Sequence, residues 1–350
     1  MSKMTIKISD RKIGKGYPCF IIAEAGVNHN GDVKLAEKLI DAAKKAGADA
    51  VKFQTFKAEN LVIEKAEMAD YQIKNTKKKQ GQLAMLKKLE LGFEEFIRLK
   101  KYCDKKGIIF LSTPHSEDAV DFLYPFVPAY KIGSGDLTNI PLLEKIAKKQ
   151  KPLIISTGMS TLKEIRRAVS AVKRAGNPNI VLMHCTTNYP CPLEEVNLKA
   201  MKTLEKEFNV PVGYSDHTEG IIVSGMAIAL GAKIIEKHFT LSKDLAGPDH
   251  KASLEPDELK DLVITIREIE KALGSSTKKP AKSEFSIKKI VRKSLIAKTN
   301  IDKGAIISRD MITCKRPGTG IPPFMINKVI GKKAKTGIEK DQLLLFKDLI

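Results

Sequence analysis

Two histidines that follow apolar runs in the second half of the chain are the first candidates for chemistry. The stretch "VPVGYSDHT" (210–218) contains His217, and "AKIIEKHFT" (232–240) contains His238. If both runs are neighbouring parallel strands, the two imidazoles project from adjacent strand ends and can share a divalent cation. Two histidine ligands leave coordination positions open, as a catalytic site requires. We therefore predict a metal site at these two residues.

Three carboxylates are candidates for supporting this metal site. Asp216 precedes His217 and Glu236 lies two residues before His238, so we expect both carboxylates to orient the ligands from nearby. Glu24 ends an earlier apolar run, and we expect it to hold a water molecule or handle its proton. The alternative for each histidine is a simple hydrogen bond to a neighbouring loop.

Lysine and hydroxyl side chains stand at the ends of several other apolar runs. Donors that converge from several strands can hold a phosphate and a carboxylate together, so they favour an anionic, phosphorylated substrate. The members of this set are Lys52, Lys131, Ser134, Ser156 and Ser215. A strand-end lysine can also form a Schiff base, as in metal-free aldolases, and the sequence leaves that alternative open.

The elements that must position these residues are short apolar runs that alternate with amphipathic helical stretches. This pattern is typical of a parallel sheet covered by helices. The predicted strands are 19–24, 49–54, 108–113, 129–134, 152–157, 179–185, 210–215 and 232–238. Eight such strands predict a (β/α)8 TIM barrel, whose active site lies at the carboxyl ends of the strands. A doubly wound sheet is not favoured, because no glycine-rich phosphate loop follows the first strand.

Two segments depart from this regular alternation. The insertion 57–91 between the second and third strands is long enough to form a lid or a wall over the barrel mouth. Residues 276–286 are polar and lysine-rich, as in a linker, and residues 287–350 form a small module of short strands and turns. The sequence therefore predicts a barrel domain over 1–275, a linker and a C-terminal domain.

Composition limits the class of protein. The net charge of +20 does not indicate nucleic acid binding, because the lysines lie on polar faces of predicted helices and tryptophan is absent. No apolar run approaches the roughly 18 residues that cross a bilayer. The first residues lack the apolar core of a secretory signal, so we expect a cytoplasmic protein without membrane contact. Five scattered cysteines without a C-x-x-C pair predict reduced thiols.

Sequence blocks spread over nearly the whole chain carry a family resemblance. They include "FIIAEAGVNHNGD", "VKFQTF", "HCTTNYPCPLEEVNLKAM", "GYSDHT", "IIEKHFTL", "GPDHKASLEP" and "KRPGTGI". In this order they resemble the sialic acid synthase family of nonulosonate synthases. The resemblance implies a barrel that condenses phosphoenolpyruvate with an N-acetylated, mannosamine-type hexosamine. It also implies a C-terminal antifreeze-like domain of the SAF (β-clip) class and a homodimer that exchanges this domain between subunits.

The resemblance also implies roles for individual residues. His217 and His238 would bind manganese or magnesium, and Glu24 would position the reacting water or its proton. The residues that would hold phosphoenolpyruvate are Lys52, Lys131, Ser134, Ser156 and Ser215, with Thr113 nearby. The residues that would contact the sugar are Gln54, Asn75, Thr187, Tyr189 and Asp249, with Arg316 reaching in from the other subunit.

Two positions depart from the usual pattern of the family. Thr187 replaces an asparagine of one branch and is nearer to the legionaminate synthases, and His115 in "STPHS" stands where phenylalanine is usual. The sugar therefore stays open between N-acetylmannosamine and a 2,4-diacetamido sugar. The alternatives to the synthase are a Schiff-base aldolase of the same barrel class and a non-catalytic carbohydrate-binding protein. The full set of polar strand ends favours an enzyme.

Overall fold

The computed structural model describes residues 5–76 and 81–350. The chain forms two compact units, with the boundary in the sequence between Gly274 and Ser275, and each unit is described by itself. Residues 77–80, which belong to the predicted insertion 57–91, lie outside the described residues, as do residues 1–4. No helix in the described ranges is both long and apolar enough to cross a membrane.

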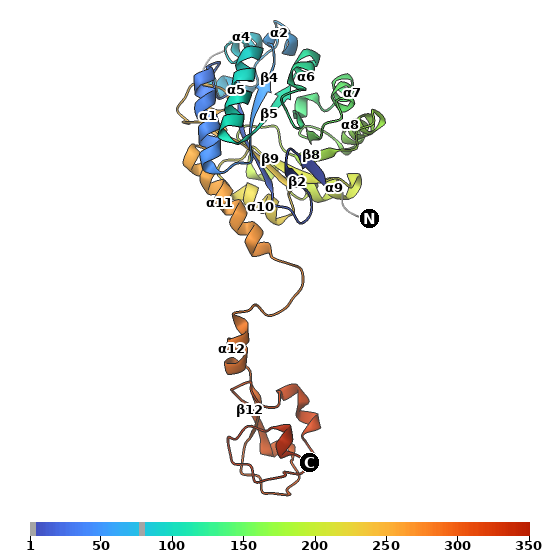
Figure 1. Cartoon of the computed structure of the whole chain (residues 1–350), viewed down its shortest axis with the longest axis vertical. Coiled ribbons are helices and arrows are strands. Elements are labelled where there is room, and N and C mark those ends of the chain that lie inside the picture. The colour runs from blue at the N-terminus through green and yellow to red at the C-terminus, as the bar shows by residue number, and fades with distance from the viewer. Residues whose placement is uncertain (1–4, 77–80) are drawn as a thin grey trace. The chain divides into compact units, whose positions relative to one another are not determined.

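The first unit is a nearly closed barrel of parallel strands, as the sequence predicts (Figure 1). The strands are β3 (Phe20–Gly26), β4 (Ala50–Thr55), β5 (Ile109–Pro114), β6 (Tyr130–Ile132), β7 (Leu153–Ser156), β8 (Ile180–His184), β9 (Val212–Asp216) and β10 (Ile234–His238). The first barrel strand, β3, pairs in parallel with the last one, β10, so the first and last strands of the barrel are neighbours. Each predicted strand is confirmed to within two residues at either end.

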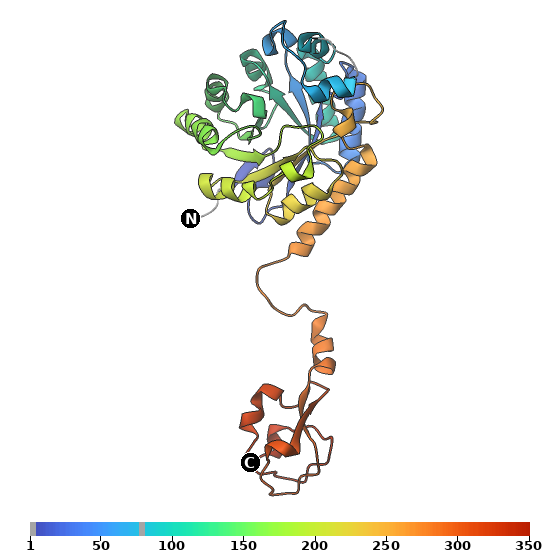
Figure 2. The same cartoon turned by 180° about the vertical axis from the view of Figure 1, so that it is seen from behind.

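Helices cover the outer face of this barrel (Figures 1 and 2). They are α1 (Val33–Ala46), α5 (Phe93–Lys106), α6 (Glu117–Leu123), α7 (Ile140–Lys148), α8 (Leu162–Arg174), α9 (Ala200–Phe208), α10 (Ile222–Ala229) and α11 (Pro256–Leu273). In α1 the Asp32 side chain accepts hydrogen bonds from the first free backbone N–H groups, and Gly47 ends the helix with a φ of 87°. The apolar face between these caps packs on the strands.

A short hairpin fills the amino-terminal end of the barrel. Strand β1 (Ile6–Ile8) pairs antiparallel with β2 (Arg11–Ile13). Ile6, Ile8 and Ile13 are at most 1% exposed and pack with the apolar side chains of the barrel interior. The sequence does not predict this hairpin, because three-residue strands contain too little alternation to stand out. Since apolar side chains close this end, the polar groups of the barrel gather at the other.

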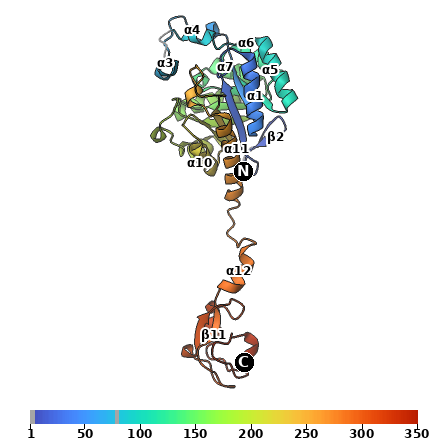
Figure 3. The same cartoon turned by 90° about the vertical axis from the view of Figure 1, so that its left-hand side faces the viewer.

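In the predicted insertion, the described residues 57–76 and 81–91 lie beside the open end of the barrel, where Tyr71 and Asn75 contact its loops. The insertion contains the short helices α2 (Ala58–Leu61), α3 (Asp70–Thr76) and α4 (Gln82–Lys87), which Figure 3 shows at the edge of the barrel unit. Met68 and Met85 of the insertion pack with Val27 and Phe56 of the barrel unit in a separate buried apolar cluster. The ring of Tyr71 in α3 lies 5.1 Å from that of Tyr189, centroid to centroid.

The second unit is small and built from short elements. Helix α12 (Glu284–Val291) begins inside the segment predicted as linker, and β11 (Ser294–Ala297) pairs antiparallel with β12 (Ile312–Lys315). Fully buried apolar residues such as Leu295, Val329 and Leu344 form a core separate from that of the barrel. The 3-10 turns of the two units are η1 (Ser134–Asp136), η2 (Leu193–Glu195), η3 (His250–Ala252), η4 (Arg309–Met311), η5 (Pro323–Lys328) and η6 (Phe346–Asp348).

Candidate active site

Polar side chains at the carboxyl ends of the strands enclose a cavity of about 190 Å³. Inward-facing residues of a strand alternate with residues that face the helices, so each strand contributes one or two side chains. The side chains that line the cavity are Glu24, Lys52, Gln54, Thr113, His115, Lys131, Ser134, Ser156, Cys185, Thr187, Tyr189, Ser215, His217, Glu236 and His238. This set includes every predicted site residue except Asn75, Asp216, Asp249 and Arg316.

Two lysines and two glutamates form a buried ion-pair network in the cavity. Lys52 Nζ lies 2.7 Å from Glu24 Oε2 and 3.8 Å from Glu236 Oε2. Lys131 Nζ lies 3.1 Å from Glu236 Oε1. None of these side chains is more than 4% exposed, so their mutual attraction is poorly screened by solvent.

This network separates the proton affinities of its members. Burial raises the pKa of Glu24 above its ordinary value, against the opposing effect of Lys52. For Glu236, Lys131 and Lys52 outweigh burial and hold the pKa of the carboxyl below its ordinary value. The two glutamates likewise outweigh burial at Lys52 and raise the pKa of its ammonium group. Lys52 therefore stays protonated, and Glu24 is the carboxyl best suited to carry a proton near neutral pH.

Hydroxyl groups surround this network. Thr113 Oγ1 accepts a hydrogen bond from Lys52 Nζ at 3.2 Å, and Ser215 Oγ donates one to Glu236 Oε1 at 3.0 Å. Ser134 Oγ accepts one from the backbone N–H of Gly158 at 3.1 Å. Within the described part of the chain, two further buried hydroxyls that line the cavity have no hydrogen-bond partner; they belong to Ser156 and Thr187. Unpartnered buried hydroxyls are costly unless a ligand satisfies them.

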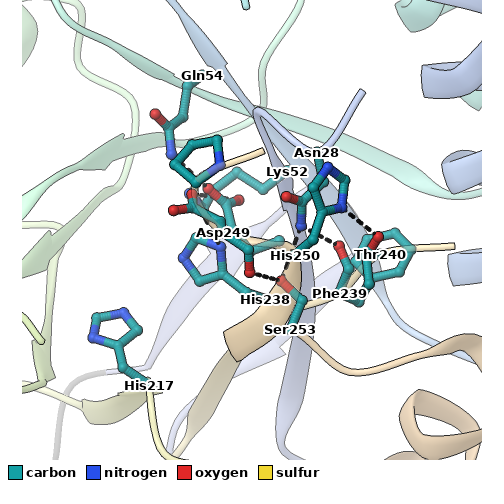
Figure 4. Close-up of polar contacts among 12 residues, drawn as sticks. Asn28, Lys52, Gln54, His217, His238, Phe239, Thr240, Asp249, His250 and Ser253 are labelled. Carbon is teal, nitrogen blue, oxygen red and sulfur yellow. Dashed lines mark hydrogen bonds and ion pairs between the residues drawn. The ribbon is translucent and has the colours of Figure 1, made fainter. Parts of the chain in front are cut away.

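The two predicted histidines lie together at the cavity. The ring centroids of His217 and His238 are 5.7 Å apart, and Figure 4 shows the two side chains extending from neighbouring strands. His217 Nδ1 is 2.6 Å from the carbonyl oxygen of Thr186, which leaves Nε2, 3.4 Å from Ser215 Oγ, as the nitrogen that can bind a metal ion. His238 Nδ1 is buried without a hydrogen bond and lies 3.9 Å from Asp249 Oδ2.

This pair fits a divalent cation. Burial lowers the pKa of His217 to about 4 and the pKa of His238 well below its ordinary value, so both imidazoles are neutral at pH 7, as metal ligands must be. In the ranges that the structure describes, no three His, Cys, Asp or Glu side chains are arranged to hold a metal ion. Two histidines alone would leave positions open for water and substrate.

The residues predicted to contact a sugar lie beside the histidines or at the rim. Tyr189 places its ring 4.1 Å from that of His217, and Gln54 Nε2 donates to Glu24 Oε1 at 3.3 Å. Asn75 and Asp249 do not line the cavity: Asn75 Nδ2 donates to the carbonyl of Pro248 at 2.6 Å. Both residues therefore lie beside the mouth of the cavity. Burial raises the pKa of Asp249 to about 6.

A buried polar network holds the loop that carries Asp249. Asn28 Nδ2 donates to the carbonyl of Phe239 at 2.8 Å and to Ser253 Oγ at 2.9 Å. Ser253 Oγ in turn donates to the backbone carbonyl of Asp249 at 2.7 Å, as Figure 4 shows. The backbone on both sides of this loop is therefore fixed from the β3 side of the barrel.

Two predictions need comment. Asp216 faces the helices and contacts neither histidine side chain; its carboxylate accepts from Ser224 Oγ at 2.6 Å and pairs with Lys237 Nζ at 3.1 Å. Asp216 therefore does not orient a histidine ligand by direct contact, because alternation along β9 puts its side chain on the opposite face from His217. Arg316 lies in the second unit, and its predicted role stays a prediction.

Comparisons with known proteins match each unit of the chain to a known family. Residues 39–278 match the NeuB family, and residues 292–350 match the SAF domain. The chain belongs to the NeuB family. It is 48% identical to the N,N'-diacetyllegionaminic acid synthase of Legionella pneumophila over 97% of this chain and 99% of that protein. It is 41% identical to the N-acetylneuraminate-9-phosphate synthase of Homo sapiens over 96% and 94% of the two chains.

A solved structure shares the fold of this NeuB-family chain. The N-acetylneuraminic acid synthetase of Leptospira borgpetersenii is 38% identical, has a TM-score of 0.73, and aligns with 81% of this chain and 95% of its own. These findings confirm the predicted family and the predicted C-terminal SAF domain.

The cavity of this NeuB-family chain also contains two residues that the sequence did not place there. Cys185 follows the end of β8, and its Sγ lies 3.2 Å from Ser134 Oγ. His115 follows the end of β5 and stands two residues after Thr113, on the same inward side. That spacing of two was the available signal for His115, because alternate residues of a strand share a face.

Proposed function

We propose that this NeuB-family chain is a nonulosonate synthase that joins phosphoenolpyruvate, an N-acetylated hexosamine and water. A bond forms between C3 of phosphoenolpyruvate and the aldehyde carbon of the open-chain sugar. Water adds at C2, and the C2–O bond then breaks, which releases inorganic phosphate and leaves the 2-keto acid. The observation that carries this proposal is one cavity with paired neutral histidines beside buried lysines and unpartnered hydroxyls.

His217 and His238 are proposed to hold Mn²⁺ or Mg²⁺. Such a cation acts as a Lewis acid that polarises a carbonyl group. The chain presents His217 in a fixed tautomer, because its Nδ1–H donates to the carbonyl of Thr186 at 2.6 Å. Tyr189 packs on the ring and limits its rotation.

Lys52 and Lys131 are proposed to bind the anionic groups of phosphoenolpyruvate, together with Thr113 and the hydroxyls of Ser134, Ser156 and Ser215. Both lysines already face carboxylates, so a bound anion would replace part of an existing ion-pair network. Glu24 is proposed to accept the proton of the water that adds at C2. Its raised pKa gives it appreciable populations of both protonation states near pH 7.

The sugar is proposed to bind at the rim, between Tyr189, Thr187, Gln54 and the Asn75–Asp249 edge. Candidates are N-acetylmannosamine and 2,4-diacetamido sugars, and the identity to the Legionella pneumophila protein supports including the second class. A homodimer that exchanges its C-terminal domains, with Arg316 reaching the sugar of the other subunit, belongs to the same proposal.

A Schiff-base aldolase is the less favoured function. A lysine nucleophile must lose its proton, but Glu236 and Glu24 raise the pKa of Lys52. A carbohydrate-binding protein without catalysis is disfavoured by the charged cavity, because burying four ionisable groups is expensive and gives no advantage in binding a neutral sugar.

The test is release of inorganic phosphate from phosphoenolpyruvate with Mn²⁺ or Mg²⁺ and a panel of sugars. The panel contains N-acetylmannosamine, its 6-phosphate, a 2,4-diacetamido hexosamine and, as a control, N-acetylglucosamine. We expect stoichiometric phosphate and keto acid with one of the first three, and loss of both in His217→Ala and His238→Ala. Sugar binding without phosphate release from any member would contradict the proposal, as would full turnover by metal-free protein.

A further inference from the structure

We propose that His115 donates a hydrogen bond to the phosphate group of bound phosphoenolpyruvate and that Asp136 orients it for this contact. The proposal rests on the function proposed above and adds a substrate-contacting residue at a position where the family resemblance implies phenylalanine. It starts from an imidazole in the cavity wall that has a carboxylate on one nitrogen and no partner on the other.

The geometry around His115 fixes which nitrogen is available. Its Nδ1 lies 3.1 Å from Oδ2 of Asp136, which belongs to η1 after the next strand. Asn139 Nδ2 donates to the second oxygen of this carboxylate at 3.3 Å and so restrains it. The carboxylate accepts a hydrogen bond from Nδ1–H. Nε2 donates to a phosphate when the ring also carries a proton there, and the two flanking anions, Asp136 and the phosphate, favour that imidazolium. His115 Nε2 is therefore the nitrogen left for a ligand.

That nitrogen has no protein partner. Among the described residues, His115 Nε2 is a buried polar atom without a hydrogen bond. The ring is held in place, because Phe56 packs against it edge-on with centroids 6.2 Å apart and the backbone N–H of His115 donates to Thr55. A fixed, buried and unpartnered nitrogen in a cavity wall indicates a ligand that satisfies it.

The position of His115 in the barrel indicates which part of the substrate it meets. In the order of strands, β5 lies four places from β9, which is the opposite side of the barrel from His217. C3 of phosphoenolpyruvate must face the sugar aldehyde on the His217 side. Its carboxylate and phosphate are both attached at C2, so they extend toward the wall that contains His115.

Depth in the cavity distinguishes the phosphate from the carboxylate. Lys52 pairs in register with Leu111, whereas His115 lies four residues further along, beyond the end of β5 and nearer the mouth. The smaller carboxylate suits the deep lysines. The phosphate has more acceptor oxygens, leaves the enzyme as product, and suits the outer wall, where Ser134 Oγ is also available. Phenylalanine at this position would offer no donor.

The experiment compares the wild type with His115→Phe, His115→Gln, Asp136→Ala and the matched control His184→Phe. His184 also ends a strand, but its Nε2 bonds the carbonyl of Val196 at 2.8 Å outside the cavity. The first measurement is the Kd of inorganic phosphate by calorimetry, without sugar. The second is the pair of KM values for phosphoenolpyruvate and for the sugar, and thermal unfolding verifies that each variant folds.

We expect His115→Phe to raise the Kd of phosphate and the KM for phosphoenolpyruvate by about ten- to a hundred-fold, the range for losing a hydrogen bond to a charged group. The KM for the sugar should not change. His115→Gln places an amide donor near the former Nε2 and should recover part of the loss. Asp136→Ala should give a smaller loss of the same kind, and His184→Phe should give none.

Three results would overturn the proposal. They are an unchanged phosphate Kd in His115→Phe, a change confined to the sugar KM, and an equal loss in His184→Phe. If His115→Phe does not fold, the Gln and Asp136→Ala variants decide on the same measurements. Because phosphate binding is measured without turnover, a selective loss of phosphate affinity supports the role of His115 even if no sugar on the panel is converted.

Discussion

The buried pair of Lys237 and Asp216 gives the sharpest prediction about how the histidines are positioned. Lys237 and Asp216 are opposite each other in the register of β10 and β9, and each is 1% exposed. Lys237 Nζ lies 3.1 Å from Asp216 Oδ2 and also donates to the carbonyl of Thr218. Asp216 Oδ1 accepts from the backbone N–H of Thr218 at 2.9 Å. The residues on both sides of His217 are therefore tied to one ion pair.

The perturbation is Lys237→Met, which keeps most of the side-chain volume and removes the charge. Breaking a buried ion pair from one side costs about 3–5 kcal/mol, because the remaining charge is left uncompensated. We expect the lower end, about 3 kcal/mol, because Asp216 keeps donors from Thr218 and Ser224. The double variant Asp216→Asn/Lys237→Met removes both charges. Its loss of unfolding free energy should therefore be smaller than the sum of the losses in the two single variants, by at least about 1 kcal/mol.

Two assays test this account. Urea unfolding of the single and double variants measures the coupling free energy, and Mn²⁺ titration by calorimetry measures the effect on the proposed metal site. We expect Mn²⁺ affinity to fall by about tenfold in Lys237→Met, as is typical for outer-shell partners of metal ligands. Additive unfolding free energies would refute the ion pair as a unit. Unchanged Mn²⁺ affinity in a destabilised variant would refute its role in positioning His217.

Further predictions concern titration, covalent chemistry and the second unit. Burial lowers the pKa of His29 to about 4, so below pH 6.5 only the unfolded chain takes up this proton, and stability falls until about pH 4. Between pH 7 and pH 4 the wild type should lose about 3 kcal/mol more unfolding free energy than His29→Gln. Urea unfolding at both pH values measures the two losses, and equal losses would contradict this pKa. Borohydride with phosphoenolpyruvate and sugar should trap no adduct, and a mass increase on Lys52 or Lys131 would instead support an aldolase. Co-refolded Arg316→Ala and His217→Ala should recover up to about a quarter of wild-type activity if subunits share sites; no recovery despite demonstrated mixed dimers would exclude that sharing.

The barrel itself could be predicted because its signal repeats. Eight apolar runs bounded by turns each repeat the same pattern, so an error at one run does not change the assignment. The hairpin of Ile6–Ile8 and Arg11–Ile13 has no such repetition, and its burial depends on the barrel interior that it covers. Likewise, α12 starts inside a lysine-rich segment without a capping hydrogen bond from the Ser283 side chain. The Glu284 carboxylate instead accepts from the backbone N–H of Ala281 at 2.6 Å, a contact that composition does not reveal.

The sequence could predict which residues stand at the carboxyl ends of the strands, but not how their side chains face or pair. The sequence places Ser215, Asp216 and His217 together, but the face of each side chain depends on the pleat of β9, so the sequence alone did not show that Asp216 points away from the cavity. The partnership of His115 with Asp136 joins residues 21 positions apart that follow the consecutive strands β5 and β6, and such pairs follow only from the closed barrel. The pKa values of Glu24 and Glu236 differ because of burial and shared lysines, which are properties of the assembled cavity.

Strands β9 and β10 explain why carboxylates stand beside both histidines. On the inner face, Ser215 and Glu236 join the lysine network next to the histidines. On the outer face, Asp216 and Lys237 form an ion pair that no substrate can reach. Each strand therefore carries polar residues on both faces, for binding on one and for rigidity on the other. Because both faces carry functional or structural polar residues, the segments "YSDHT" and "IIEKHFT" are polar although they lie in the protein core. A buried parallel strand without such roles would be apolar on both faces.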